Sequence, residues 1–341
     1  MKKLRINQKN ITIMATIGLL VLLYMIGILS FKNFSKPQVF LNIFVDNAFL
    51  IVVATGLAFV MISGGIDLSV SSVVAFTTMA LSSMLQSGVN AYLAMVIVLA
   101  GGILFGLLQG FIIVRFNIHS WIVTLAGMFL ARGSCYLISI QSIPINNEVF
   151  VELSKHKIYL YGKNFISISV VVALAVVAIA ILVSKYTKFG RSLYAIGGNK
   201  KSAILMGLPV MRNNITAYAI SSFCAVLGGI IFSLYMLSGY ALHCDGLEMD
   251  AIACCVIGGI LLTGGVGNLI GPLLGVMSMG IIQTIIMFQG TLSSWWTKIV
   301  IGILLTVFIV LQRFIVLQRE KRGKVQAIER DTKPKTSKST A

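Results

Sequence analysis

The sequence predicts an all-α, polytopic integral membrane protein with about ten transmembrane helices. Its 341 residues are 57% hydrophobic and only 11% charged, which is far from the usual composition of a soluble domain. An apolar stretch of roughly 20 residues spans the hydrocarbon core of a bilayer as a helix. Stretches of this kind recur from Ile11 to Leu311 with few charges inside them.

The chain opens with a basic segment, residues 1–10, followed by an apolar stretch from Ile11 to Phe31. That stretch is longer than the apolar region of a signal peptide, roughly 7 to 15 residues, so we expect an uncleaved first helix. Residues 11–312 are therefore expected to form one transmembrane domain. The ten expected spans lie near residues 11–31, 40–63, 66–86, 91–114, 119–140, 165–184, 214–238, 250–266, 269–288 and 295–312.

The basic residues are distributed unevenly along the chain. Most of the 27 lysines and arginines fall in residues 1–10, 185–213 and 313–341, whereas most of the acids fall in the alternate loops. Short loops rich in lysine and arginine stay in the cytoplasm, so both termini are predicted to be cytoplasmic. The net charge of +17 thus lies in tails and loops, which argues against a nucleic-acid partner.

The C-terminal segment, residues 313–341, is polar and basic and is expected to be disordered. One interpretation, which we favour, is that its positive charge keeps the C-terminus on the cytoplasmic side beside anionic membrane lipid. The alternative is that it binds a specific partner. The cysteines and histidines show no ligand spacing, and the cysteines are interpreted as small buried hydrophobic residues. The sequence therefore predicts no metal site, no cofactor and no catalytic residue.

An interruption of the apolar pattern lies between Ile62 and Phe76, where Gly64, Gly65 and Asp67 stand among four serines. Backbone that leaves the helix at membrane depth must be buried in protein or line a water-filled cavity. Asp67 is interpreted as the cap of a helix that opens at Leu68, accepting a backbone N–H from Ser69 or Val70. Direct contact with a substrate is the alternative.

A second interruption, residues 262–272, repeats the scheme of a hydroxyl residue, two glycines and a branched apolar residue. Here the glycines are Gly264 and Gly265. Broken helices at matching places in two halves point to an internally duplicated transporter with its pathway between the halves. Close packing of helices through small residues explains the same glycines without a duplication.

The longest loop predicted on the cytoplasmic side is residues 185–213. Within it, Asn199 is expected to cap a short helix that ends at Met206, with Gly207 at the stop position. Lys200 and Lys201 would be exposed in its first turn. Such a helix either docks in a groove of a soluble partner or lies on the lipid surface.

The motifs of the chain resemble a known family. The segments SGGIDLSVSSVVAF, TLAGMFLARG, FGRSLYAIGGNKKSAILMGLP and IGGILLTGGVGNLIGPLLGV closely resemble the permeases of ribose-type ABC sugar importers. The segments VDNAFLIVVATGLAFVMISGGIDLSV, SIPIN, GYAL and GTLSSWWTKIVIGILL look most like one of the paired permeases of the galactofuranose importer of enteric bacteria. The sequence has no GxxxxGK[ST] motif of its own, so any ATP chemistry belongs to a partner.

The resemblance implies an ABC importer permease architecture in the bacterial inner membrane. The implied partners are an ATPase on the cytoplasmic face, a second homologous permease and a periplasmic binding protein that delivers the sugar. The ATPase would dock on the loop from Gly190 to Pro209. The residues implied in this coupling are Gly190, Asn199, Lys200, Lys201, Leu205, Met206 and Gly207.

The candidates for the sugar pathway are Asn47, Tyr235 and Gln283, because a sugar needs hydrogen-bonding groups and an aromatic face near the midplane. Each is also explained as a polar residue of ordinary helix packing. Two other functions stay open. An ion-coupled secondary transporter is disfavoured because the spans lack a row of acids and bases. A membrane-embedded enzyme would need a carboxylate cluster, and the outer-loop acids 245–250 are the only such group.

Overall fold

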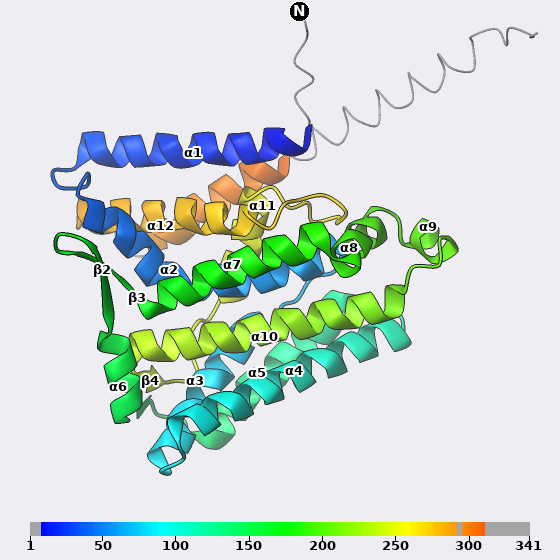
Figure 1. Ribbon diagram of the computed structural model, residues 1–341, viewed down its shortest axis with the longest axis horizontal. Coiled ribbons are helices and arrows are strands. Elements are labelled where there is room, and N and C mark those ends of the chain that lie inside the picture. The colour runs from blue at the N-terminus through cyan, green and yellow to red at the C-terminus, as the bar shows by residue number, and fades with distance from the viewer. Residues whose placement is uncertain (1–7, 292–294, 311–341) are drawn as a thin grey trace, which may run out of the picture.

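The computed structural model describes residues 8–291 and 295–310, so residues 1–7 and the whole of the predicted tail, 313–341, lie outside the described residues. Long helices run side by side and connect at two opposite ends of the molecule (Figure 1). The long helices are α1 (Gln8–Ser30), α2 (Pro37–Ile62), α4 (Ala91–Arg115), α5 (Ser120–Ile138), α7 (Ile168–Tyr186), α10 (Val210–Met236) and α12 (Gly271–Gln289). Within the described ranges, these seven helices are long and apolar enough to cross a membrane.

The remaining helices are shorter. Helix α3 and the helix Trp295–Val310 are apolar but shorter than the seven long ones. The others lie mostly in connections. The short helices with labels are α3 (Val70–Gln86), α6 (Glu148–Lys155), α8 (Lys188–Gly198), α9 (Lys200–Leu205) and α11 (Leu247–Ile257). The all-α, multi-span class is thus confirmed, with about ten as an approximate count.

Two expected spans differ from the structure. The expected span 250–266 is wrong as a continuous helix, because α11 ends at Ile257 and residues 258–270 are irregular. Gly259, Gly264 and Gly265 have positive φ there, a conformation that no right-handed helix contains. The expected span 66–86 starts later than expected, because α3 begins at Val70.

Four short strands form two antiparallel pairs. The strands β2 (Lys157–Tyr161) and β3 (Asn164–Ser167) make a hairpin that turns at Gly162, where φ is +62°. The strands β1 (Ile143–Pro144) and β4 (Ser238–Gly239) join the segment after α5 to the end of α10. Both pairs lie at the end of the molecule opposite α8 and α9 (Figure 1).

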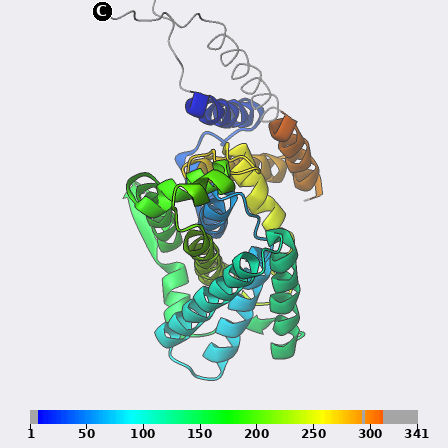
Figure 2. The same cartoon turned by 90° about the vertical axis from the view of Figure 1, so that its right-hand side faces the viewer.

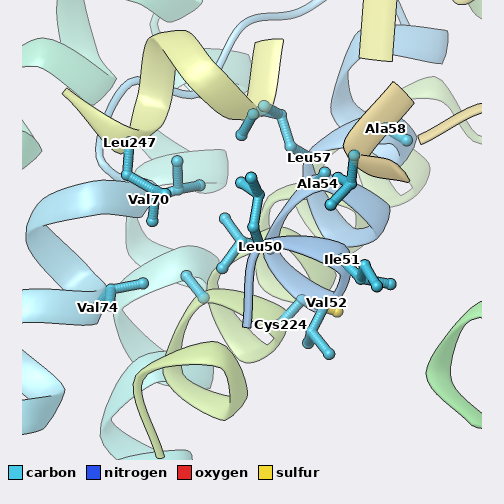
Figure 3. Packing of buried hydrophobic residues seen from close by; sticks show 14 of the residues in the cluster. Leu50, Ile51, Val52, Ala54, Leu57, Ala58, Val70, Val74, Cys224 and Leu247 are labelled. Carbon is cyan, nitrogen blue, oxygen red and sulfur yellow. The ribbon is translucent and has the colours of Figure 1, made fainter. Parts of the chain in front are cut away.

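Helix α2 is the centre of the core. Pro37 occupies its first turn, where the missing N–H costs nothing, and every residue from Leu50 to Ile62 is buried. A helix that is apolar all round is stable only when other elements surround it. Side chains of α2 meet Val70 and Val74 of α3, Cys224 of α10 and Leu247 of α11 (Figure 3).

Helix α10 packs against α2, α3 and α4 through small residues. Gly102, Gly106 and Gly110 recur every four positions on the face of α4 that meets α10. A Cβ on Gly106 would lie 2.6 Å from the carbonyl oxygen of Tyr218 and 2.7 Å from Cβ of Ser222. This spacing lets the two backbones approach closely, as small-xxx-small interfaces do in membranes.

The two ends of the molecule carry different elements. The end with α8 and α9 also holds the start of α1 and the connection between α4 and α5 (Figure 1). Viewed onto this end, α1 lies at one edge and α4 and α5 lie at the opposite edge (Figure 2). The segment between Ile168 and Met236 carries basic residues at this end and no acid at all.

Candidate functional site

The segment 187–209 projects from the ends of α7 and α10, and we call it the α8–α9 segment. Thr187 opens α8, with its Oγ1 accepting the N–H of Gly190 at 3.1 Å. Gly190 packs against the last turn of α7, where a Cβ would lie 2.5 Å from Cα and the carbonyl oxygen of Ser184. Only a glycine therefore lets α8 fold back this tightly onto α7.

Helix α9 forms the tip of the α8–α9 segment. Asn199 caps it, with Oδ1 accepting the N–H of Ser202 at 2.9 Å. The helix ends at Leu205 with Met206 as its C-cap, one residue before the expected end, and Gly207 follows with a φ of +73°.

The side chains of α9 divide between an anchor and an exposed tip. Ala203 is buried in a small cluster with Ile196 of α8 and Val210 of α10. Leu205 is 89% exposed and Met206 is 65% exposed, and Lys200 and Lys201 are exposed as well. Ala203 thus fixes one face of α9 to the protein, and the exposed apolar side chains of Leu205 and Met206 are available to a partner.

Residues 63–69, which we call the first break, separate α2 from α3. Gly64 has a φ of +86°, and Ile66 donates its N–H to Ser120 Oγ of α5 at 3.1 Å. Thr124 also faces this backbone, with its hydroxyl 3.4 Å from the Ile66 carbonyl. Side chains of α5 therefore satisfy backbone groups that the break leaves outside a helix.

Asp67 is the polar centre of the first break and is 1% exposed. Its Oδ1 accepts the N–H of Ser69 at 3.0 Å and the Ser69 hydroxyl at 2.6 Å. Its Oδ2 accepts the Ser221 hydroxyl of α10 at 2.7 Å. The expected hydrogen bond from the Ser69 N–H is confirmed. The expected cap is wrong, because α3 begins at Val70 and not at Leu68, and its N-cap residue is Ser69.

Residues 258–270, which we call the second break, separate α11 from α12. Gly264 has a φ of +81° and Gly265 a φ of +74°, so both adopt the left-handed conformation that glycine tolerates. Leu261 donates its N–H to the carbonyl oxygen of Val266 at 3.1 Å, which closes the loop on itself.

The two breaks meet each other and the end of α8. Gly265 donates its N–H to the carbonyl oxygen of Ile62 at 2.8 Å. A Cβ on Gly264 would lie 2.7 Å from Cα of Gly64, and one on Gly265 would lie 2.6 Å from Cα of Gly198. A Cβ on Gly197 would overlap the Ile62 carbonyl oxygen and the Gly265 nitrogen. We call the five residues of this contact the glycine junction: Gly64, Gly197, Gly198, Gly264 and Gly265. Gly65 instead packs against the Tyr218 ring of α10.

Backbone contact makes the glycine junction a stiff connection. No side chain lies between the three segments, so the end of α8 is in direct backbone contact with Ile62 and Gly265. Tyr194 of α8 adds a further tie, because its hydroxyl donates to the carbonyl oxygen of Gly267 at 3.2 Å. The α8–α9 segment is thus in direct contact with both breaks.

None of the three cavities found among the described residues is lined by more than one of the three pathway candidates. Asn47 is 5% exposed, donates to the carbonyl of Ile43 at 2.9 Å and packs against Gly280 of α12. Tyr235 is half exposed at the far end, with its hydroxyl 3.4 Å from Asp46 Oδ1. Gln283 is partly buried on α12. Asn47 therefore acts as a packing residue here, and only Tyr235 borders a described cavity, of about 150 Å³.

A polar cluster that the sequence did not reveal joins Arg132 of α5 to the α10–α11 connection. Nη1 of Arg132 donates to the carbonyls of Ala241, at 2.5 Å, and His243, at 2.9 Å, and Nη2 lies 3.7 Å from Asp245. A cation inside a span thus stabilises backbone that has left a helix. The imidazole of His243 packs against the rings of Phe232 and Tyr240.

Comparison with known proteins gives the relatives of this chain. The family model described as branched-chain amino acid transport system / permease component matches residues 39–309. The inner membrane ABC transporter permease protein YjfF of Escherichia coli (strain K12) is 48% identical over 316 residues, covering 92% of this chain and 96% of that protein. No solved structure matches this chain.

Two further relatives carry the name of a sugar. The fructose import permease protein FruG of Bifidobacterium longum (strain NCC 2705) is 36% identical, covering 92% of this chain and 94% of that protein. The ribose import permease protein RbsC of Bacillus subtilis (strain 168) is 32% identical, covering 87% of this chain and 91% of that protein.

Proposed function

We propose that this chain is the membrane-spanning subunit of an ABC importer for a monosaccharide. The chain belongs to the family described as branched-chain amino acid transport system / permease component. Relatives named for fructose and ribose import support a sugar as the cargo. Galactofuranose is the sugar we propose, on the resemblance of the segments SIPIN, GYAL and GTLSSWWTKIVIGILL.

The proposed assembly has four kinds of subunit. An ATPase docks on the exposed tip of α9, a second homologous permease completes the pathway, and a periplasmic binding protein delivers the sugar. The protein lies in the bacterial inner membrane with both termini in the cytoplasm, which the basic residues near α8 and α9 support. Both ATP hydrolysis and sugar capture then belong to partner subunits.

The observation that carries the proposal is the contact of the last residues of α8 with both helix breaks. ATP binding draws the two ATPase subunits together, and α9 follows the subunit on which it docks. Gly197 and Gly198 transmit this shift to Ile62 and Gly265 through backbone contact. The cavity between the two permeases then changes the side to which it opens, a rigid-body form of alternating access.

The hydrogen bond from Ser221 to Asp67 extends the coupling to α10. Since Asp67 also holds the start of α3, the first break moves together with α3 and α10. The second break is continuous with α12. One movement at the α8–α9 segment therefore reaches the core helix α2 and its neighbours.

The test is ATP-driven uptake in liposomes that contain the permease, its ATPase and its binding protein. We expect galactofuranose to accumulate only with ATP, and fructose and ribose to accumulate poorly. Leu205→Asp places a charge on the exposed tip, so ATPase association and uptake should both be lost. Leu160→Asp, at a residue 59% exposed on the β2–β3 hairpin, is the matched control and should transport normally.

Two outcomes would contradict the proposal. Uptake that needs no ATPase and follows an ion gradient would identify a secondary transporter. ATP-driven uptake of an amino acid, with no uptake of any of the three sugars, would show that the cargo is not a monosaccharide. The assignment as an ABC permease would still hold.

A further inference from the structure

A cavity of about 630 Å³ lies at the base of the α8–α9 segment, between α8 and the first turns of α10. Three cationic side chains line it: Lys188 and Arg191 of α8, and Arg212 of α10. Phe189 and Leu208 contribute apolar wall beside them. A cavity with this combination accepts a group that is anionic on one side and apolar on the other.

The three cations have no acidic partner among the described residues. The lining of the cavity contains no Asp or Glu, and none occurs anywhere from Ile168 to Met236. Both described ion pairs lie elsewhere, in the α10–α11 connection and at α11. The one described hydrogen bond of these three side chains joins Arg191 Nη1 to the carbonyl of Tyr186 at 3.3 Å. Their positive charge is therefore available to an external anion.

The position of the cavity along the helices identifies the kind of anion. Lys188 stands two residues beyond the end of α7, and Arg212 stands in the first turn of α10. Both helices have the length and composition of membrane spans, so their ends lie at the level of the lipid headgroups. Tyr186, 73% exposed at the same level, is of the type that gathers at membrane interfaces.

The α9 tip extends farther from the bundle than the start of α10 does (Figure 1). A soluble protein seated on Leu205 and Met206 would thus contact the outermost part of the segment, whereas the cavity lies nearer to the bilayer. Lysine and arginine side chains both bind phosphate oxygens through charge-assisted hydrogen bonds. Basic pockets between transmembrane helices on the cytoplasmic side bind anionic headgroups in this way.

We propose that this cavity binds the phosphate of an anionic phospholipid, with Lys188, Arg191 and Arg212 holding the phosphate and Phe189 and Leu208 packing against the first carbons of an acyl chain. The site would hold the base of the α8–α9 segment against the membrane. It requires only that the chain is embedded in lipid, and it stands whether or not the transported molecule is a sugar.

The experiment uses the purified full-length chain alone, without an ATPase, in nanodiscs of equal phosphatidylcholine and phosphatidylglycerol. After detergent extraction, the ratio of the two lipids retained per protein is measured by native mass spectrometry. The variant Arg191→Gln/Arg212→Gln is expected to lower the retained ratio of anionic to neutral lipid by about 25-fold, since each of the two cations contributes roughly fivefold. The matched control is Lys200→Gln/Lys201→Gln, which removes the same charge from exposed α9 and should retain the native ratio.

Three results would overturn the proposal. An equal loss in the control would mean that retention reflects net charge and not the cavity. Displacement of the lipid by millimolar inorganic phosphate would identify free phosphate as the ligand. Unchanged lipid retention in Arg191→Gln/Arg212→Gln would mean that the cations of the cavity do not hold the lipid. Melting temperatures equal to that of the native protein would establish that all variants are folded. Arg212→Lys keeps the positive charge and should retain most of the anionic lipid that Arg191→Gln/Arg212→Gln loses.

Discussion

The backbone N–H of Gly265 donates a 2.8 Å hydrogen bond to the carbonyl oxygen of Ile62, 203 positions earlier in the chain. This bond joins the last residue of α2 to the loop that precedes α12. Gly197, at the end of α8, lies against both atoms of the bond. Two helix breaks and the proposed docking segment therefore meet at one hydrogen bond.

The Asp67–Ser221 pair is expected to stabilise the first break. Asp67→Ala removes an acceptor of three hydrogen bonds and should lower the free energy of unfolding by about 3 kcal/mol, whereas Ser221→Ala should cost about 1 kcal/mol. The double variant should cost less than the sum, because the two side chains share a bond. SDS unfolding in mixed micelles measures all three. Strict additivity would mean that the bond contributes nothing.

The glycine face of α4 is expected to set its distance from α10. Gly106→Ala puts a methyl group 2.6 Å from the Tyr218 carbonyl oxygen and should destabilise the protein by about 1–3 kcal/mol. Gly101→Ala on the same helix meets no atom within 4 Å and should be neutral or slightly stabilising. Thermal unfolding of the two variants compares them directly, and equal melting temperatures would argue against close packing here.

Arg132 is expected to order the α10–α11 connection. Arg132→Gln removes the cation whose Nη1 bonds the carbonyls of Ala241 and His243. Amide exchange in residues 240–246 should accelerate by about tenfold or more, because hydrogen bonds from a charged group contribute roughly 1.5–3 kcal/mol. Arg115→Gln, at the end of α4, leaves that connection untouched and serves as the control. Unaltered exchange in Arg132→Gln would show that other contacts hold the loop.

The same connection is expected to weaken in acid. Burial, and then the positive charge of Arg132, lower the pKa of His243 below its ordinary 6.5. The unfolded state then binds a proton before the folded state does, so the stability from the neutral ring is complete above pH 6.5. It is lost as pH falls from there toward the depressed pKa.

Melting temperatures between pH 7.5 and 5 test this prediction against His243→Phe. The phenylalanine keeps the ring contacts with Phe232 and Tyr240 but binds no proton. The native protein should therefore lose more stability over this interval than the variant. A parallel decline in both would assign the acid sensitivity to other groups.

The fold class followed from the sequence because hydropathy depends only on composition over short windows. Helix ends were harder to predict, because they depend on tertiary contacts. Val70 begins α3 since the Asp67 side chain binds Ser69, and the α5 residue Ser120 bonds the backbone of Ile66. The expected span 250–266 was wrong because its average hydropathy concealed glycines whose positive φ ends the helix.

The candidate site could be predicted in its parts but not in its assembly. The two glycine pairs and the cap at Asn199 were visible as local patterns. The contact of both glycine pairs with Gly197 joins residues more than 60 positions apart. Such a long-range contact cannot be predicted from local patterns in one sequence. Gly197 itself carries no local signal that separates it from Gly198. The triple repeat of Gly102, Gly106 and Gly110 was a signal that could have indicated the α4 interface.

The variant Gly197→Ala tests most directly whether movement of the α8–α9 segment reaches the helix breaks. A methyl group there overlaps the Ile62 carbonyl oxygen and the Gly265 nitrogen, while Gly198→Ala meets nothing within 4 Å. In liposomes with ATPase and binding protein, ATP-driven sugar uptake is measured together with ATPase association. We expect Gly197→Ala to bind the ATPase but to lose uptake by about tenfold or more, because overpacking costs roughly 1–3 kcal/mol. Gly198→Ala should transport normally. Native uptake by Gly197→Ala, or an equal loss in both variants, would contradict this prediction.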